Sequence, residues 1–224
     1  RQLMCYILNI ESSSTNCSIS LAHKGIVISF KEKNDENYSH STKLHAFIQE
    51  VLKESNTSIN ELSAIAVSKG PGSYTGLRIG VAAAKGLCYA LDIPLISLST
   101  LLILSKQIRI EKGLIVPVLD ARRDEVYSAA YDSNYNLIQK EKPEIINKDS
   151  FKELLSSFKL HFIGSGQEKC KRLIKKNLNL KFSSIDNFPS SKEMVILSYE
   201  KFINSDFEDL AYFEPAYLKN FVSN

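Results

Sequence analysis

The segment Ser68–Gly80 restricts the fold of this chain more than any other part of its sequence. It follows an apolar run, Leu62–Val67, that predicts a buried strand, and Gly70-Pro71-Gly72 predicts the turn after that strand. Ser73 is predicted to cap a helix that begins at Tyr74. Helix N-termini after glycine-rich turns bind phosphates in many proteins. However, the Gly-Lys-Ser/Thr that closes a Walker A loop is missing from this sequence.

The helix predicted from Tyr74 to Leu91 has little polar surface. Its apolar stripe comprises Tyr74, Leu77, Val81, Ala84, Cys88 and Leu91, and a second stripe of small residues comprises Gly76, Gly80 and Ala83. Its charged residues, Arg78 and Lys85, lie nearly in line. A helix that is apolar almost all round is buried on more than one side. It is therefore either a central helix wrapped by its own protein or part of a subunit interface, and periodicity alone favours neither.

Composition narrows the class of protein. A length of 224 residues suits one large domain or two small lobes, and 44% hydrophobic residues suffice for a packed core. A net charge of +3 is too small to predict a nucleic-acid binder. The four cysteines lack metal-ligand spacing, which indicates free buried thiols in a reducing compartment. No apolar run reaches transmembrane length. We expect Met4 to be the native start and, because no signal peptide is recognisable, a cytoplasmic protein without membrane contact.

One pattern occurs twice: a strand that ends in an acid, then a hairpin and a third strand. Cys5–Ile10 precedes Glu11, and Leu114–Leu119 precedes Asp120. Strands that alternate with helices indicate an α/β fold with a partly parallel sheet. We therefore predict a duplicated, two-lobed chain. The N-terminal lobe comprises residues 4–108 and the smaller C-terminal lobe residues 109–224, and the last predicted helix, 191–204, can pack back on the first lobe.

Four motifs together resemble the bacterial TsaB family of tRNA threonylcarbamoyladenosine biosynthesis proteins. They are Ile10-Glu11-Ser12-Ser13-Ser14-Thr15, the segment Gly70–Gly80, Asp120-Ala121-Arg122 with Glu125-Val126-Tyr127, and Glu214-Pro215-Ala216-Tyr217-Leu218. The resemblance implies a two-lobed actin-like ATPase fold, which is a duplicated ribonuclease H-like fold, with a reduced second lobe. It also implies a non-catalytic subunit that forms a heterodimer with TsaD, the enzyme that transfers a threonylcarbamoyl group to the adenosine beside the tRNA anticodon. The ATPase TsaE docks on that pair, and tRNA is contacted only through the complex.

The resemblance also implies where the partner binds. The interface would be formed by two helices, through Leu44, Phe47, Ile48, Tyr74, Gly76, Leu77, Arg78, Gly80, Val81 and Lys85. Without TsaD, an exposed apolar surface of this kind is expected to form a homodimer. A nucleotide held at the interface is compatible with the resemblance.

Several residues look like the remnant of a nucleotide site. In nucleotide-using relatives an acid ends the first strand of each lobe and positions a metal. Here Glu11, followed by Ser12 and Ser13, is one methylene longer than the usual Asp. In the second lobe Asp120 is present, but Arg122 replaces the glycine that would let the backbone approach a phosphate. We expect no catalysis and no cofactor required by this chain, and the alternative is a small actin-fold ATPase or kinase active on its own.

Other candidate residues have simpler explanations. Gly164-Ser165-Gly166 either cradles a nucleotide or forms an ordinary strand-to-helix turn. His40 and His45 would lie about 140° apart on a helix, and His23 and His161 lack a partner nearby, so we expect no metal. The hydroxyl run after Glu11 is typical of turns. A cluster of basic residues is typical of a solvated helix face; it comprises Lys169, Lys171, Arg172, Lys175 and Lys176. The alternatives are a weak contribution to tRNA binding or a free-standing RNA-binding module.

Overall fold

The computed structural model describes residues 5–35, 40–184 and 188–218. The chain divides into two compact lobes. The first lobe comprises residues up to Ile103 together with Pro189–Ala216, and the second comprises Leu104–Phe188 together with Tyr217 and Leu218. This division differs from the predicted one because the chain returns to the first lobe after residue 188.

The first lobe is built on a five-stranded mixed sheet with the strand order β3-β2-β1-β4-β5. Strands β1, β2 and β3 form an antiparallel meander, and β4 and β5 run parallel to β1. The register is fixed by residues that alternate between two cores, as in β1, where Ile7 and Leu8 belong to opposite faces. The strands are β1 (Tyr6–Glu11), β2 (Asn16–His23), β3 (Ile26–Asn34), β4 (Leu62–Gly70) and β5 (Leu95–Ser99).

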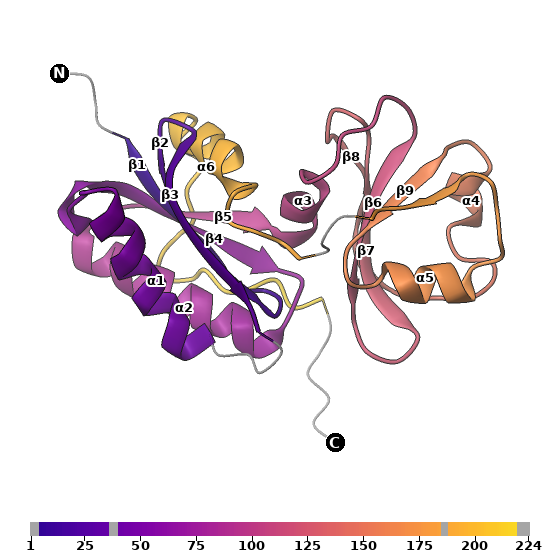
Figure 1. The fold of residues 1–224 in the computed structure, drawn as a ribbon, viewed down its shortest axis with the longest axis horizontal. Coiled ribbons are helices and arrows are strands. Elements are labelled where there is room, and N and C mark those ends of the chain that lie inside the picture. The colour runs from indigo at the N-terminus through magenta and orange to yellow at the C-terminus, as the bar shows by residue number, and fades with distance from the viewer. Residues whose placement is uncertain (1–4, 36–39, 185–187, 219–224) are drawn as a thin grey trace. The chain divides into compact units, whose positions relative to one another are not determined.

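Helices cover both faces of this sheet, as Figure 1 shows. Helices α1 (His40–Glu54) and α2 (Tyr74–Leu91) lie side by side on one face, and α6 (Met194–Ile203) packs on the other. A 3-10 turn, η1 (Ile59–Glu61), leads into β4, and α3 (Thr100–Ser105) follows β5 directly. The helix predicted from residue 74 to 91 has these bounds in the structure, and α6 packs on the first sheet as expected for the last helix.

The second lobe repeats the topology of the first. Its sheet has the order β10-β9-β6-β7-β8, in which β6, β7 and β8 form an antiparallel meander and β9 pairs in parallel with β6. Strand β6 therefore corresponds to β1, and Asp120 to Glu11. The elements are β6 (Leu114–Asp120), β7 (Glu125–Tyr131), β8 (Leu137–Ile145), α4 (Lys152–Leu155), β9 (Leu160–Ile163), α5 (Gln167–Leu173) and β10 (Leu180–Phe182).

This repeated topology confirms the duplicated, ribonuclease H-like fold of two-lobed actin-like proteins, with a second lobe that is reduced. The helices of the second lobe are short, because α4 has four residues and α5 has seven. Strand β10 was not predicted, since its three residues carry no recognisable period.

Candidate functional site

The glycines of the segment after β4 pack against the turn that follows β1. Gly72, Gly76 and Gly80 are spaced four apart; Gly72 packs against Ser13, and Gly76 and Gly80 pack against Ser12. A Cβ on Gly76 would lie 2.1 Å from the carbonyl oxygen of Ser12, and one on Gly80 would lie 2.2 Å from Ser12 Oγ. Ser12 Oγ also donates to the carbonyl oxygen of Gly76 at 2.9 Å. Close approach therefore occurs at these glycines, but the approaching backbone belongs to the same chain.

The start of α2 is occupied by the same turn. The backbone N–H of Ser73 donates to the carbonyl oxygen of Ser13 at 2.7 Å. The Ser73 hydroxyl accepts from the backbone N–H of Gly76 at 3.3 Å, which confirms the predicted N-cap. Because these donors are satisfied within the chain, the glycine-rich turn serves to anchor α2 on β1.

Most of the predicted interface residues are buried in the chain's own core. Leu44, Ile48, Leu77 and Val81 are at most 5% exposed, and Leu44, Ile48 and Val81 belong to the cluster between the sheet and the two helices. Phe47 is half-buried against the same cluster, and Gly76 and Gly80 are buried under the turn after β1. For the buried residues the prediction of a partner contact is therefore wrong, because they face their own sheet or turn. For the half-buried Phe47 it stays a prediction.

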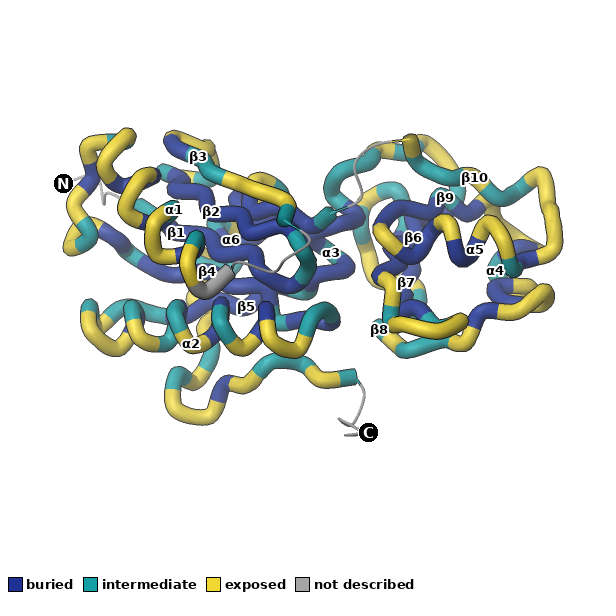
Figure 2. Tube along the Cα trace, turned by 60° about the horizontal axis from the view of Figure 1, so that its bottom comes forward, coloured by how far each residue is buried: buried dark blue, intermediate teal, exposed yellow. Residues whose placement is uncertain are grey.

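The opposite side of α2 is exposed and made largely of small residues. We define the outer α2 face as Thr75, Arg78, Ala82, Gly86 and Tyr89, which follow one another at spacings of three and four. A Cβ on Gly86 would meet no atom within 4 Å, and Tyr89 is 83% exposed. Figure 2 shows this exposed strip along α2. The sequence could have predicted the outer α2 face, because the apolar stripe and the stripe of small residues lie on the same side of the helix and leave the opposite side uncovered.

Two predicted interface residues are exposed at the start of this face. The guanidinium carbon of Arg78 lies 5.3 Å from the centre of the Tyr74 ring, and its Nη1 donates to the Tyr74 hydroxyl at 3.2 Å. Both side chains are exposed. This cation–π pair presents an aromatic surface and a positive charge together, a combination that is common in protein interfaces.

Lys85, which was predicted to lie at the partner interface, contacts the C-terminal segment of its own chain. Its ammonium group donates to the carbonyl oxygens of Ala211 and Phe213, at 3.3 and 3.0 Å. These contacts hold the segment after α6 alongside α2, as Figure 2 shows. Tyr212, which lies between the two acceptors, is 85% exposed. The C-terminal segment that Lys85 holds thus carries a further exposed tyrosine.

The acid at the end of β1 is turned into the protein. Glu11 is fully buried, and its Oε1 accepts hydrogen bonds from the backbone N–H and the hydroxyl of Ser13, at 2.6 and 2.5 Å. Burial raises the pKa of the Glu11 carboxyl to about 7, because the hydrogen bonds from Ser13 offset only part of the desolvation cost. Its Oε2 has no hydrogen-bond partner among the described residues. Glu11 is therefore placed to support the turn rather than to reach a ligand.

The acid at the end of β6 is neutralised by a lysine. Asp120 Oδ2 lies 3.0 Å from Lys169 Nζ, and that ammonium group also donates to the carbonyl oxygen of Glu125 at 2.8 Å. The other carboxylate oxygen of Asp120 accepts from the backbone N–H of Arg122 at 2.7 Å. Arg122 itself adopts a left-handed backbone with φ of 67°. Asp120 and Arg122, which were predicted as part of a nucleotide-site remnant, thus stabilise the hairpin between β6 and β7.

The glycines before α5 behave like those of the first lobe. A Cβ on Gly164 would lie 2.2 Å from the carbonyl oxygen of Val118, and one on Gly166 would lie 2.8 Å from the Val126 side chain. These contacts fit the strand-to-helix turn that was one of the two interpretations of this segment.

The remaining candidates give no site of their own. Within residues 5–35, 40–184 and 188–218, no group of three or more His, Cys, Asp or Glu side chains is arranged to hold a metal ion. His45 is exposed on α1, whereas the side chain of His40 lies outside the described residues. All four cysteines are free and buried, as predicted. Among the helices that the structure describes, none is long and apolar enough to cross a bilayer.

Comparison with known proteins defines the class first. A solved structure of YeaZ from Pseudomonas aeruginosa superimposes with a TM-score of 0.83 at 23% identity and covers 96% of this chain and 100% of its own. A family model described as TsaD, tRNA N6-adenosine threonylcarbamoyltransferase, matches residues 34–220. The chain is therefore a two-lobed actin-like protein related to that transferase.

Two relatives define the family within that class. A tRNA threonylcarbamoyladenosine biosynthesis protein TsaB from Buchnera aphidicola subsp. Baizongia pistaciae is 34% identical over 95% of this chain and 97% of its own length. TsaB from Escherichia coli is 29% identical over 97% and 96%. The chain belongs to the TsaB family.

Proposed function

We propose that this chain is a non-catalytic subunit that pairs with TsaD and supports threonylcarbamoyl transfer to the adenosine beside the anticodon of tRNA. The observation that carries the proposal is the outer α2 face. Its small residues, Ala82 and Gly86, allow a partner helix to approach closely, and Tyr89 provides a large aromatic contact next to them. Because the TsaD family model matches most of this chain, TsaD is expected to carry the equivalent helices, and the two proteins can pair through related surfaces.

The two acids support the non-catalytic part of the proposal. Metal-assisted phosphate chemistry needs ionised carboxylates that are free to bind the metal. Glu11 is buried with a raised pKa, and Asp120 is paired with Lys169. The chain uses both acids for its own structure.

Further parts of the proposal concern the assembly around the pair. TsaE docks on the TsaB–TsaD pair, tRNA is bound by the complex as a whole, and the chain forms a homodimer through the outer α2 face when TsaD is absent. No cofactor is required by this chain, and a nucleotide bound at the interface with TsaD is compatible with this role. The complex acts in the cytoplasm.

The proposal is tested by size-exclusion chromatography with light scattering on this chain mixed with TsaD from the same organism. The wild type and an Asn134→Arg control, which adds the same charge to an exposed turn of the second lobe, are expected to form the heterodimer. Ala82→Arg and Gly86→Arg are expected to lose it while keeping the circular dichroism spectrum of the wild type.

An ATPase assay of each sample completes the test. Heterodimer formation that is unaffected by both variants would remove α2 from the interface. Turnover by the isolated chain that is lost in Asp120→Asn would instead identify the chain as an ATPase or kinase.

A further inference from the structure

Positive charge is concentrated in one part of the second lobe. Residues 148–181 contain nine lysines and arginines against three acidic residues, a formal net charge of +6, whereas the whole chain carries +3. The rest of the chain is therefore slightly acidic. A charge separation of this size produces a local potential that attracts polyanions.

Three of these nine charges are engaged with carboxylates of the same lobe. Lys169 is paired with Asp120 at 3.0 Å, and Arg172 lies 3.6 Å from Asp124. Lys171 lies 3.9 Å from Glu168 on the exposed side of α5. The basic residues of α5, which formed most of the predicted cluster, are thus largely offset by neighbouring acids.

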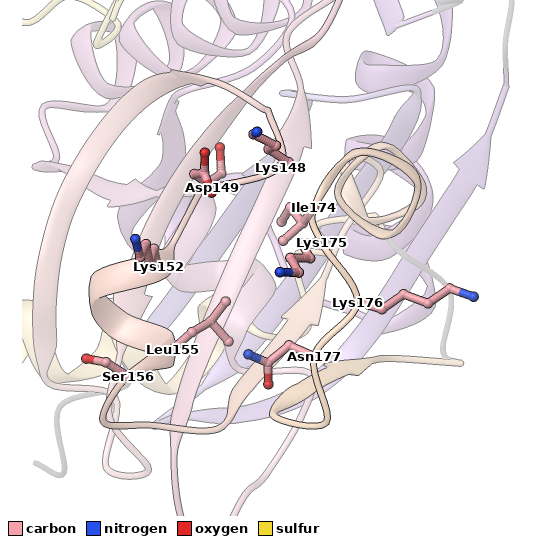
Figure 3. A pocket seen from close by; sticks show the side chains of 10 residues that line it. Lys148, Asp149, Lys152, Leu155, Ser156, Ile174, Lys175, Lys176 and Asn177 are labelled. Atoms are coloured by element: carbon pink, nitrogen blue, oxygen red, sulfur yellow. The ribbon is translucent and has the colours of Figure 1, made fainter.

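Four of the six remaining charges line a hollow between two segments. A cavity of about 390 Å³ lies between the α4 segment and the residues that follow α5, and Lys148, Lys152, Lys175 and Lys176 line it. Figure 3 shows Lys148, Lys152 and Lys175 around the hollow, whereas Lys176 extends away from it. Within the described parts of the chain, none of these four ammonium groups lies within 4.0 Å of a carboxylate oxygen. We call these four residues the lysine hollow.

The base of the lysine hollow is fixed. Leu155 and Ile174 line it and belong to the core of the second lobe. The backbone N–H of Lys175 donates to the carbonyl oxygen of Lys148 at 3.1 Å, which joins the two segments. Asp149, the acid among the lining residues, leaves the hollow with a net positive charge. Four exposed lysines therefore line one fixed base, three of them around the hollow and Lys176 extending from its edge.

We propose that the lysine hollow binds the phosphate backbone of RNA and positions tRNA on the complex. Lysine ammonium groups recognise phosphates as point charges and need no base contacts, so the surface would orient tRNA without reading its sequence. RNA is favoured over other polyanions because this inference rests on the proposed function, in which the complex modifies tRNA. The surface differs from the outer α2 face and leaves that face available to TsaD.

The test measures tRNA binding by fluorescence anisotropy, with the chain alone and with its complex with TsaD, over a range of salt concentrations. The test variant carries Lys148→Gln, Lys152→Gln, Lys175→Gln and Lys176→Gln, all at exposed positions. The matched control removes the same charge at four other exposed lysines, through Lys24→Gln, Lys33→Gln, Lys112→Gln and Lys140→Gln. Anionic lipid vesicles serve as the competing polyanion.

We expect the test variant to bind tRNA at least about tenfold more weakly than the wild type, and the control to stay within about twofold. The slope of log K against log salt should fall by about three in the test variant, because it removes four charges and each phosphate contact contributes about 0.7–0.9. Binding by the intact complex that is unchanged in the test variant would overturn the inference, as would lysine-dependent binding to vesicles in place of tRNA. Lysine-dependent tRNA binding without any complex with TsaD would uphold the inference and contradict the proposed function.

Discussion

The two sides of α2 predict opposite effects of one substitution, glycine to alanine, at positions ten residues apart. At Gly86 the new methyl group meets no atom within 4 Å. Alanine favours the helix over glycine by about 1 kcal/mol, so Gly86→Ala should raise the melting temperature of the first lobe by about 2–4 °C. At Gly76 the same methyl group would lie 2.1 Å from the carbonyl oxygen of Ser12.

The clash at Gly76 outweighs the gain in helix propensity. A backbone oxygen cannot rotate away, so α2 and the turn after β1 must separate, at a cost of about 1–3 kcal/mol for overpacking. The hydrogen bonds from Ser12 Oγ to Gly76 and from Ser73 to Ser13 would also be strained, at about 1 kcal/mol each. The net cost is about 2–4 kcal/mol, so Gly76→Ala should lower the melting temperature by about 4–16 °C.

Differential scanning calorimetry of both variants and the wild type measures these shifts. The reasoning predicts shifts of opposite sign. It is refuted if Gly76→Ala is as stable as Gly86→Ala, because the glycine spacing would then have no packing role within the chain.

Three further predictions concern the strand-end acids and the C-terminal segment. The pKa of Glu11 is raised from 4.5 to about 7, so between these pH values the folded chain keeps a proton that the unfolded chain releases. The free energy of unfolding should therefore fall by about 3 kcal/mol as pH rises through this window. Urea unfolding at pH 5 and pH 8 should show this decrease in the wild type and not in Glu11→Gln. An equal pH dependence in both would place Glu11 in contact with water. Asp120→Asn leaves the buried ammonium of Lys169 without its carboxylate and should destabilise the second lobe by about 1–2 kcal/mol in urea unfolding. The effect is smaller than for a fully buried pair because Asp120 is half exposed. As a control, Asp124→Asn removes an exposed ion pair with Arg172 and should change stability by less than about 0.5 kcal/mol. Lys85→Met removes two hydrogen bonds to the C-terminal segment and should speed proteolysis between Ser205 and Ala216, seen by mass spectrometry of the fragments; an unchanged cleavage rate would show that this segment is held by other contacts.

The fold could be predicted from the sequence because its signals are local. The bounds of α2 follow from the cap at Ser73 and a long apolar period. The duplication follows from two strands that end in Glu11 and Asp120. Such patterns depend on residues close together in the chain.

The direction in which α2 faces could not be read from its small residues alone. A stripe such as Gly76 and Gly80 permits close approach, but the sequence does not say which backbone approaches. The turn that does so is more than sixty residues earlier in the chain, at Ser12. The role of Lys85 depends in the same way on Ala211 and Phe213, which follow it by more than a hundred residues.

The pairing of Asp120 with Lys169 was likewise outside the reach of sequence patterns. The sequence predicted Lys169 on a solvated helix face, whereas in the structure it forms a partly buried ion pair. Because Lys169 is paired, lysines without a carboxylate partner among the described residues lie in the lysine hollow rather than in α5. Residues 148–152 and 175–176 are far apart in the sequence, and only the fold brings them together.

The central claim is that the chain acts through its surface rather than through chemistry of its own. The most direct measurement is threonylcarbamoyladenosine formation in tRNA by this chain reconstituted with TsaD, TsaE and a source of the threonylcarbamoyl group. We expect Gly86→Arg to abolish product formation, and Glu11→Gln to support it at the wild-type rate. Full activity of Gly86→Arg together with loss of activity in a folded Glu11→Gln variant would contradict the account, because the strand-end acid would then take part in the reaction.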